Sequence, residues 1–175
     1  NFYSQLGNGT TANSATPVTV TGLTDATAIV TGDAHTCALL ADDSARCWGN
    51  NTSGQLGAGS FFSSGTPVTV TGLTGATSIA TAGNHSCAVL ADGTVRCWGY
   101  NGFGQLGNGT TTNSSTPVTV AGVTDAVAIS ASAYHTCAVL IDGTSRCWGY
   151  NGSGQLGDGT TTNSSTPVTV AGVTD

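Results

Sequence analysis

The stretch Cys87-Ala-Val-Leu-Ala-Asp-Gly-Thr-Val-Arg-Cys97 decides the fold, because it reads as one β-hairpin. Asp92-Gly93 is a turn signal between two runs of strand-forming residues. A two-residue loop would place Cys87 opposite Trp98. A three-residue loop, with Gly93 in the left-handed region as a bulge, brings the two cysteines opposite each other. We predict the three-residue loop and an antiparallel hairpin in this register.

The same hairpin occurs three times, and each copy holds two cysteines. In the first copy Asp43 replaces the glycine, which is tolerable because Asp visits the left-handed region more readily than most residues. Each pair falls at a non-hydrogen-bonded position, where the Cα separation suits a disulfide worth about 2–3 kcal/mol on the chain-entropy model. The predicted disulfides are Cys37–Cys47, Cys87–Cys97 and Cys137–Cys147. Three such bridges predict an oxidising compartment, extracellular or at the cell surface.

A metal site is the rival interpretation of the same residues. His35 and Cys37 lie on one strand face with Cys47 opposite, which gives three of the four ligands that a structural zinc needs. The nearest position that could supply a fourth ligand is residue 33, 83 or 133 in the three copies. It holds Asp, Gly and Ala, so no fourth ligand repeats. We therefore expect no metal and no cofactor, and we interpret the histidines as packing or hydrogen-bonding residues.

Adding 50 to a residue number returns the same feature along the whole chain. The Gln-Leu-Gly of residues 5–7 recurs three times, as does the Pro-Val-Thr-Val of residues 17–20, which we expect to form a short strand. Strands are also expected at 76–80, 85–90 and 94–98. Four short strands per unit is the spacing of a β-propeller blade or a β-solenoid coil. We predict an all-β array of three and a half units, as a partial propeller or an open array. Its parts are a half repeat at 1–25 and full repeats at 26–75, 76–125 and 126–175.

Composition agrees with an all-β chain and excludes several functions. There is no Lys, Glu or Met, which removes most strong helix formers, while Thr, Val and 26 Gly favour strands and turns. A net charge of −6 without a basic cluster argues against nucleic acid as a partner. No apolar run approaches the roughly 20 residues that span a bilayer, so we expect no membrane insertion.

One long motif resembles a known repeat. His-Ser/Thr-Cys-Ala-Val-Leu-x-Asp-Gly-Thr-x-Arg-Cys-Trp-Gly-Tyr-Asn-Gly-x-Gly-Gln-Leu-Gly stands at 85–107 and 135–157, and with small departures at 35–57. It resembles the regulator-of-chromosome-condensation repeat, which implies a β-propeller of four-stranded blades, usually seven. The paired cysteines are similar to secreted bacterial versions of the repeat. The founder's nucleotide exchange on a small GTPase and its chromatin binding are not carried over, because they depend on basic tails and insertions that are missing here.

Catalytic signatures are scarce. Residues 102–107 and 152–157 match Gly-x-Gly-x-x-Gly, but a Thr/Asn/Ser loop follows each, where a dinucleotide site needs a helix. Without Glu or Lys, acid–base and nucleophilic options reduce to scattered Asp and the repeated His. We expect a protein that is not an enzyme.

Two sets of surface residues are candidates for contact or modification. Phe61 and Phe62 replace the Thr or Ala of other units in a polar loop, which makes them a candidate contact patch. Eight asparagines stand in Asn-x-Ser/Thr triplets and are candidate glycosylation sites. They are Asn8, Asn50, Asn51, Asn84, Asn108, Asn113, Asn151 and Asn163.

Function is predicted in two forms. The first is an extracellular structural protein that self-associates head to tail, as a surface fibre or filament, so that its partners are copies of itself. The near-identity of 104–125 with 154–175 favours this form. The alternative is a secreted propeller module that recognises a protein or a glycan across one face. That role would diversify the loops, which are nearly uniform apart from 61–62.

Overall fold

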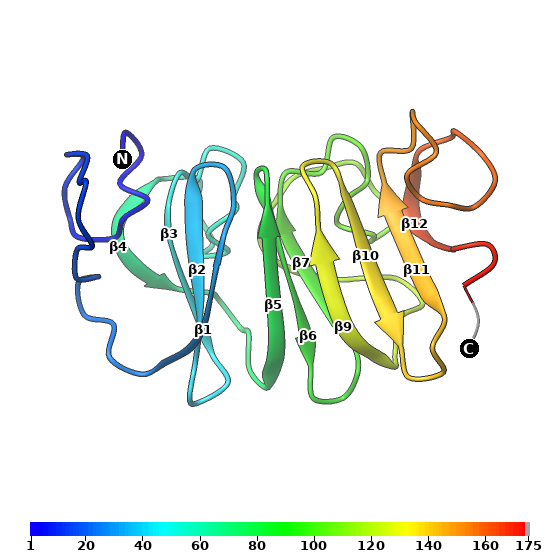
Figure 1. Cartoon of the computed structure of the whole chain (residues 1–175), viewed down its shortest axis with the longest axis horizontal. Helices are drawn as coiled ribbons and strands as arrows, with labels where there is room; N and C mark the ends of the chain where they lie inside the picture. Colours follow the sequence, from blue (N-terminus) through cyan, green and yellow to red (C-terminus); the bar gives the residue numbers. More distant parts are fainter. Residues whose placement is uncertain (174–175) are drawn as a thin grey trace.

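The computed structural model describes residues 1–173 and contains three four-stranded antiparallel sheets, each built from consecutive strands (Figure 1). Blade 1 consists of β1 (Ala26–Thr31), β2 (His35–Leu40), β3 (Ala45–Gly49) and β4 (Ser64–Thr69). Blade 2 consists of β5 (Ala76–Ala82), β6 (His85–Leu90), β7 (Val95–Gly99) and β8 (Ser114–Thr119). Blade 3 consists of β9 (Ala126–Ala131), β10 (His135–Leu140), β11 (Ser145–Gly149) and β12 (Ser164–Thr169). The last two residues of the repeat predicted at 126–175 lie outside the described residues.

The central hairpin of each blade has the three-residue loop that the sequence predicts. In blade 2, Cys87 pairs with Cys97, the Leu90 amide donates to the Thr94 carbonyl at 2.9 Å, and the Gly93 amide donates back to the Leu90 carbonyl. Gly93 has a φ of 77°, and Asp43 takes the same left-handed conformation in blade 1 with a φ of 61°. A left-handed third residue therefore sets the register in both hairpins.

The strands expected at 76–80 and 94–98 are found at Ala76–Ala82 and Val95–Gly99, and the fourth strands differ more from expectation. The fourth strand of each blade begins three residues before its proline, at Ser64 in blade 1. Residues 17–20, by contrast, form no strand, so that prediction was wrong. A fourth strand pairs with the third strand of its own blade, and residues 1–16 contain no strand with which residues 17–20 could pair. Val20 packs instead against the Trp48 side of blade 1.

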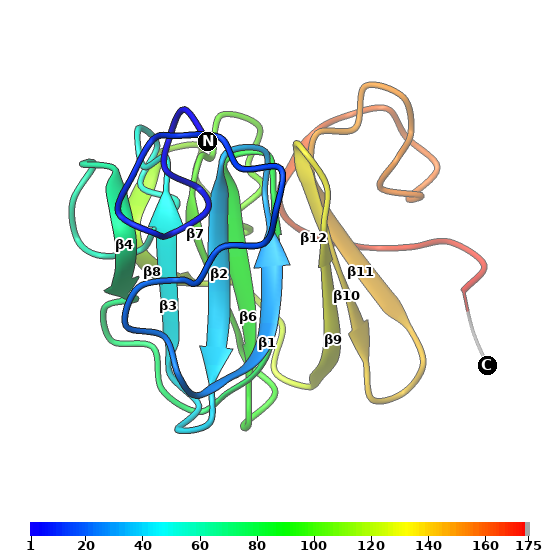
Figure 2. The ribbon, with the colours of Figure 1, turned by 60° about the vertical axis from the view of Figure 1, so that its left-hand side comes forward.

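The blades stand side by side in chain order and form an open array, not a closed ring (Figures 1 and 2). The first strands of the blades come together, since β1, β5 and β9 line one shared hollow. Apolar side chains fill the space between neighbouring blades. Leu56, Leu73 and Trp98 are buried between blades 1 and 2, and their counterparts 50 residues later are buried between blades 2 and 3. None of the described residues forms a helix that is long and apolar enough to cross a bilayer.

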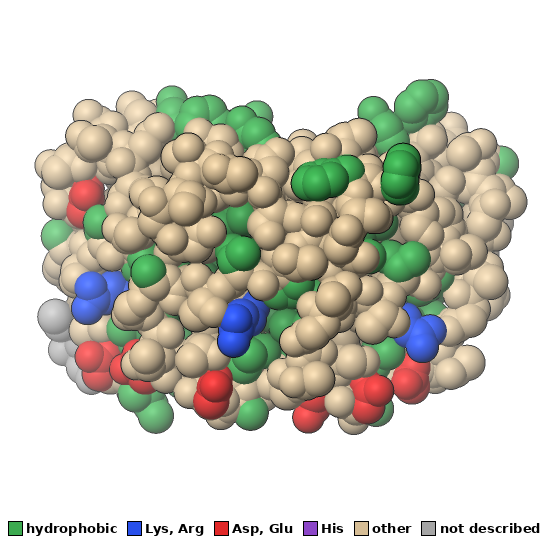
Figure 3. Space-filling model, turned by 180° about the vertical axis from the view of Figure 1, so that it is seen from behind, with side chains coloured by type: hydrophobic (Ala, Val, Ile, Leu, Met, Phe, Trp, Pro, Cys, Tyr) green, Lys and Arg blue, Asp and Glu red, His purple; other side chains and the backbone are tan. Residues whose placement is uncertain are grey.

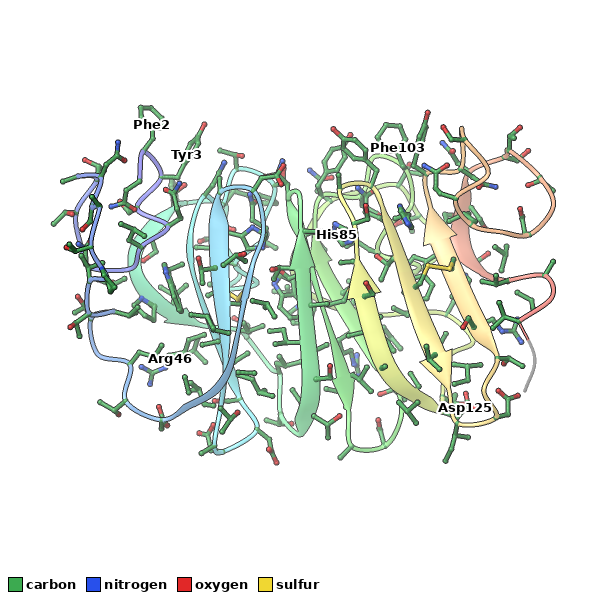
Figure 4. The ribbon with its side chains drawn as sticks, in the orientation of Figure 1. Phe2, Tyr3, Arg46, His85, Phe103 and Asp125 are labelled. Carbon is green, nitrogen blue, oxygen red and sulfur yellow. A yellow bond between two sulfur atoms is a disulfide. The ribbon has the colours of Figure 1, made fainter. Side chains whose placement is uncertain are left out.

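Up-and-down strands give the array two different edges. One edge carries the turns between the first and second strands of each blade and the long loops that lead into the fourth strands (Figure 1). The opposite edge carries the central hairpin turns and the linkers between blades. Figure 4 places Phe2, Tyr3 and Phe103 at the first edge and Asp125 at the second.

Candidate functional site

Each central hairpin is closed by a disulfide. The S–S distances are 2.05, 2.11 and 2.10 Å for the pairs in blades 1, 2 and 3, and the Cα atoms of each pair are 4.1 Å apart. Because these sulfurs are bonded to one another, the cysteines are not available as zinc ligands. The three bridges are consistent with an oxidising compartment.

The Gly-Gln-Leu-Gly segment connects neighbouring blades. The backbone carbonyl of Gln55 accepts hydrogen bonds from Trp98 Nε1 at 2.9 Å and from Ser86 Oγ at 3.0 Å, both in blade 2. A Cβ at Gly57 would lie 2.8 Å from the Trp98 Nε1 atom, so glycine allows this close approach. The same contacts recur around the carbonyls of Gln5 and Gln105.

The repeated histidines belong to this connection. His35 Nε2 lies 2.9 Å from Ser86 Oγ, and His85 Nε2 lies 2.9 Å from Thr136 Oγ1. Since the Ser86 hydroxyl donates its single proton to the Gln55 carbonyl, His35 Nε2 is the donor. Burial lowers the pKa of His35 to about 4 and that of His85 to about 3, so both rings are neutral at physiological pH. These histidines hold blades together.

A buried asparagine organises each loop at the first edge. Asn101 Nδ2 donates to the carbonyls of Thr110 and Thr112 at 3.0 Å, and its Oδ1 accepts from the Leu106 amide at 2.9 Å. Asn51 and Asn151 bond the equivalent parts of their loops. Sequence reasoning assigned no structural role to these side chains, although their 50-residue spacing was visible.

The glycosylation candidates therefore divide by burial. Asn113 and Asn163 are exposed, and Asn8, Asn84 and Asn108 are half-buried. Three candidates are buried, and the Nδ2 atoms of two of them donate to loop carbonyls, which leaves no room for a glycan: Asn50, Asn51 and Asn151. Burial therefore disfavours a glycan at these three positions.

Four aromatic rings gather where blades 2 and 3 meet at the first edge. The Phe103 ring lies at the centre, with its centroid 5.2 Å from that of Tyr134 and 5.0 Å from that of Tyr150, edge to face in both cases. Tyr100 completes the group at 6.3 Å from Phe103. Edge-to-face pairs at such distances are favourable arrangements of aromatic rings. We call these four residues the aromatic cluster.

Local sequence explains how two of the tyrosines are held. The Tyr100 ring lies over Gly102, where an added Cβ would overlap it, and the Tyr150 ring lies over Gly152 in the same way. In the first unit the equivalent positions hold Asn50 and a threonine, whose amide donates to the Asn50 side chain. A unit with tyrosine at the first of these positions therefore has glycine two residues later, and the unit without the tyrosine has no such glycine.

The predicted contact patch lies at the same edge of the array as the aromatic cluster but outside the cluster. Phe61 and Phe62 are exposed in the loop before β4, at the same edge, and the ring contacts found among residues 1–173 do not include them. All four Phe and all four Tyr of the chain lie in loops or turns of this edge, which we call the aromatic face. Its residues are Phe2, Tyr3, Phe61, Phe62, Tyr100, Phe103, Tyr134 and Tyr150.

A signal for the cluster was present in the sequence. Phe103 stands where the neighbouring units have Ser53 and Ser153, and Tyr134 stands where they have an alanine and Asn84. Departures from an otherwise faithful repeat mark positions that the scaffold does not require. Only the structure shows that these two departures meet in space.

Family models for the regulator of chromosome condensation (RCC1) repeat match most of the chain. One matches residues 1–39, 47–89, 92–139 and 143–175, and a second matches 26–55, 76–105 and 126–155. No curated protein sequence matches the chain.

Solved structures share the fold. Human WBSCR16 superposes with a TM-score of 0.86 at 23% identity, over 98% of this chain and 46% of that protein. Prp20p from Saccharomyces cerevisiae, described together with its binding to Gsp1p and histones, superposes with a TM-score of 0.76 at 22% identity, over 85% of this chain and 39% of Prp20p. The chain spans less than half the length of these proteins. The repeat matches, the four-stranded blades and the shared fold together show that this chain belongs to the regulator of chromosome condensation (RCC1) repeat family.

Proposed function

We propose that this chain is a non-catalytic, extracellular binding module that recognises another protein through its aromatic cluster. The aromatic cluster is the observation that carries the proposal, because two of its four rings stand at positions that depart from the repeat and come together at one blade boundary.

The chemistry of the face suits a protein partner. Tyr and other large aromatic residues dominate the energetic centres of protein interfaces, since they bury much area and lose little conformational entropy. The loops around the cluster consist mainly of Gly, Ser, Thr and Asn, and loops of Tyr, Ser, Gly and Asn on a rigid sheet scaffold are typical of antibody paratopes. The 49% exposure of Tyr134 leaves ring surface free for a partner.

Two further observations agree with this role. Three disulfides per chain favour an extracellular site of action. Among the structures that share the fold, Prp20p is described as binding the proteins Gsp1p and histones, which supports protein recognition as the class of function and not those partners.

The test uses the residues of the neighbouring units as replacements. Phe103→Ser and Tyr134→Asn together remove the centre of the cluster with side chains that the repeat already carries at equivalent positions. Phe62→Thr is the matched control, because it removes an exposed ring outside the cluster. Extracellular proteins of the source organism that the native chain retains are identified, and each is purified and titrated against the three chains by calorimetry.

We expect the double variant to bind a purified partner at least about tenfold more weakly, and the control to bind within about twofold of the native chain. Equal binding by all three chains would contradict the proposal. If the native chain retains a purified glycan and no protein, the result would support glycan recognition instead of protein recognition.

A second candidate, self-association, is favoured by one surface. Val139 on blade 3 is 40% exposed, whereas its equivalent Val89 is 1% exposed under the next blade. We propose a second copy of this chain as the occupant of this face, since an RCC1 blade covers the equivalent surface within the array.

Sedimentation of the native chain and of Val139→Asp tests this self-association. A concentration-dependent dimer that the variant loses is expected, and a monomer throughout would contradict it.

A further inference from the structure

The edge opposite the aromatic face is acidic. Six of the nine Asp residues lie in its hairpin turns and interblade linkers, and Figure 3 shows acidic side chains along this edge. We call this edge the acidic face and define it by Asp25, Asp42, Asp43, Asp92, Asp125 and Asp142. All three arginines lie on the third strands of the blades, a few residues beyond the hairpin turns.

A hollow of about 480 Å³ opens in the acidic face between blades 2 and 3. The β6–β7 turn, the linker before β9 and Ile141 line it. Its floor is fixed by backbone hydrogen bonds, from the Ala126 amide to the Gly93 carbonyl and from the Ile141 amide to the Asp125 carbonyl, both 3.0 Å long. The volume falls within the usual range for pockets that hold a ligand, roughly 300–1,000 Å³.

The apolar walls of the hollow are a departure from the repeat. Val127 stands where the other units have Thr27 and Thr77, and it is 55% exposed. Ile141 stands where they have alanine, and it is 76% exposed. Two large aliphatic side chains are therefore left in solvent at one blade boundary, at positions where the fold accepts smaller or polar residues.

Negative charge borders these walls. Asp92 and Asp125 line the hollow, and Asp142 follows Ile141 directly. Hydrogen bonds from the Thr94 hydroxyl and amide hold the pKa of Asp92 below its ordinary value, so this carboxylate stays ionised in mild acid. Arg96 is the cation that faces the same turn, but it lies on the other side, where Asp92 and Arg96 line a second hollow and Arg96 donates to Thr119.

We propose that this hollow docks a cationic segment of another protein, in which a Lys or Arg stands beside an aliphatic or aromatic side chain. The apolar side chain would contact Val127 and Ile141, and the cation would face Asp92 and Asp125. Charge complementarity selects this occupant over a second copy, because each copy carries a net charge of −6 and no Lys. The site lies on the edge opposite the aromatic face, so it is independent of the function proposed above.

Labelled peptides test the proposal. The probes are three fluorescein peptides of equal length in which Leu alternates with Lys, Leu alternates with Glu, or Ser alternates with Lys. Fluorescence anisotropy is measured at low and at moderate NaCl concentration, with the native chain and three variants. Val127→Thr/Ile141→Ala takes its replacements from the other units, and Asp92→Asn/Asp125→Asn keeps side-chain oxygens that can still accept the Thr94 hydrogen bonds. Phe62→Thr, on the opposite edge, is the control.

The Lys/Leu peptide is expected to bind the native chain and the control equally. The Val127/Ile141 variant should weaken this binding at least about tenfold, and the Asp92/Asp125 variant should weaken it and reduce its salt dependence. Unchanged binding by either variant would overturn the proposal. So would equal binding of the Glu/Leu peptide, which would show an apolar site without charge selection. Equal binding of the Ser/Lys peptide would overturn it too, because charge alone would then explain the interaction.

Discussion

Trp98 Nε1 donates to the backbone carbonyl of Gln55 at 2.9 Å, across the boundary between blades 2 and 1. The two residues are 43 positions apart, and the same bond joins Trp48 to Gln5 and Trp148 to Gln105. The indole is fully buried, so this bond is shielded from water and the Gln55 carbonyl depends on protein donors. The most periodic signatures of the sequence, Gln-Leu-Gly and Cys-Trp-Gly, thus meet between units and not within one.

Trp98→Phe is expected to lower the free energy of unfolding by about 2 kcal/mol, because it removes one buried hydrogen bond and leaves a small cavity. Urea unfolding followed by circular dichroism measures the change. Phe62→Thr, at an 85% exposed position, should change it by less than about 0.5 kcal/mol. Equal midpoints for the two variants would show that the interblade bond contributes nothing.

Replacing Cys87 and Cys97 together by alanine should lower the free energy of unfolding by about 2–3 kcal/mol, because the unfolded chain regains the entropy of a loop of about 11 residues. Thermal unfolding of the double variant measures this loss. Peptide mapping without reduction provides the covalent check, with three cross-linked pairs each ten positions apart. Recovery of free thiols from native material would count against the oxidising compartment.

Stability should fall as the pH decreases from about 6.5 towards 4. Burial depresses the folded pKa of His35 to about 4 and of His85 to about 3, so the unfolded chain takes up protons in this range while the folded chain does not. Each ring then costs about 2 kcal/mol at pH 5 relative to pH 8. Urea midpoints measured across this range should fall less steeply for His85→Gln than for the native chain. Parallel curves would show that the histidines are not the groups that titrate.

Asn101→Ala should destabilise the chain by about 2–3 kcal/mol, since it leaves two loop carbonyls and the Leu106 amide without their partner in a buried site. Asn113→Ala removes one acceptor at an exposed position and should cost about 1 kcal/mol or less. Chemical denaturation of both variants gives the comparison. Similar losses would mean that the loop is not organised by the buried amide.

Glycosylation, if the chain is produced in a host that attaches N-linked glycans, should follow exposure. Asn113 and Asn163 are expected to be modified, while Asn51 and Asn151 are expected to be unmodified because their amide nitrogens are buried donors. Mass spectrometry of glycopeptides before and after enzymatic deglycosylation distinguishes these positions. A glycan on Asn51 or Asn151 would contradict the loop structure.

Prediction from sequence succeeded where short-range geometry governs. The turn at Asp92-Gly93 sets the hairpin register within a dozen residues, and Cys87 and Cys97 follow from that register. It failed at residues 17–20, where strand formation depends on a partner strand and not on the local Pro-Val-Thr-Val pattern. It could not separate the buried Asn51 from the exposed Asn113, because the Asn-x-Ser/Thr triplet carries no information about burial.

The amino-acid sequence alone determined the all-β repeat, the hairpins and their disulfides, because each depends on residues that are close along the chain. The tertiary structure decided which surfaces exist. Phe103 and Tyr134 are 31 positions apart, and Val127 and Ile141 border a hollow whose opposite wall is the turn at Asp92. The 50-residue period predicts that the units have the same structure. It does not predict the angle at which each blade packs against the next. That packing brings residues of different units together, and with them the aromatic cluster and the apolar hollow of the acidic face.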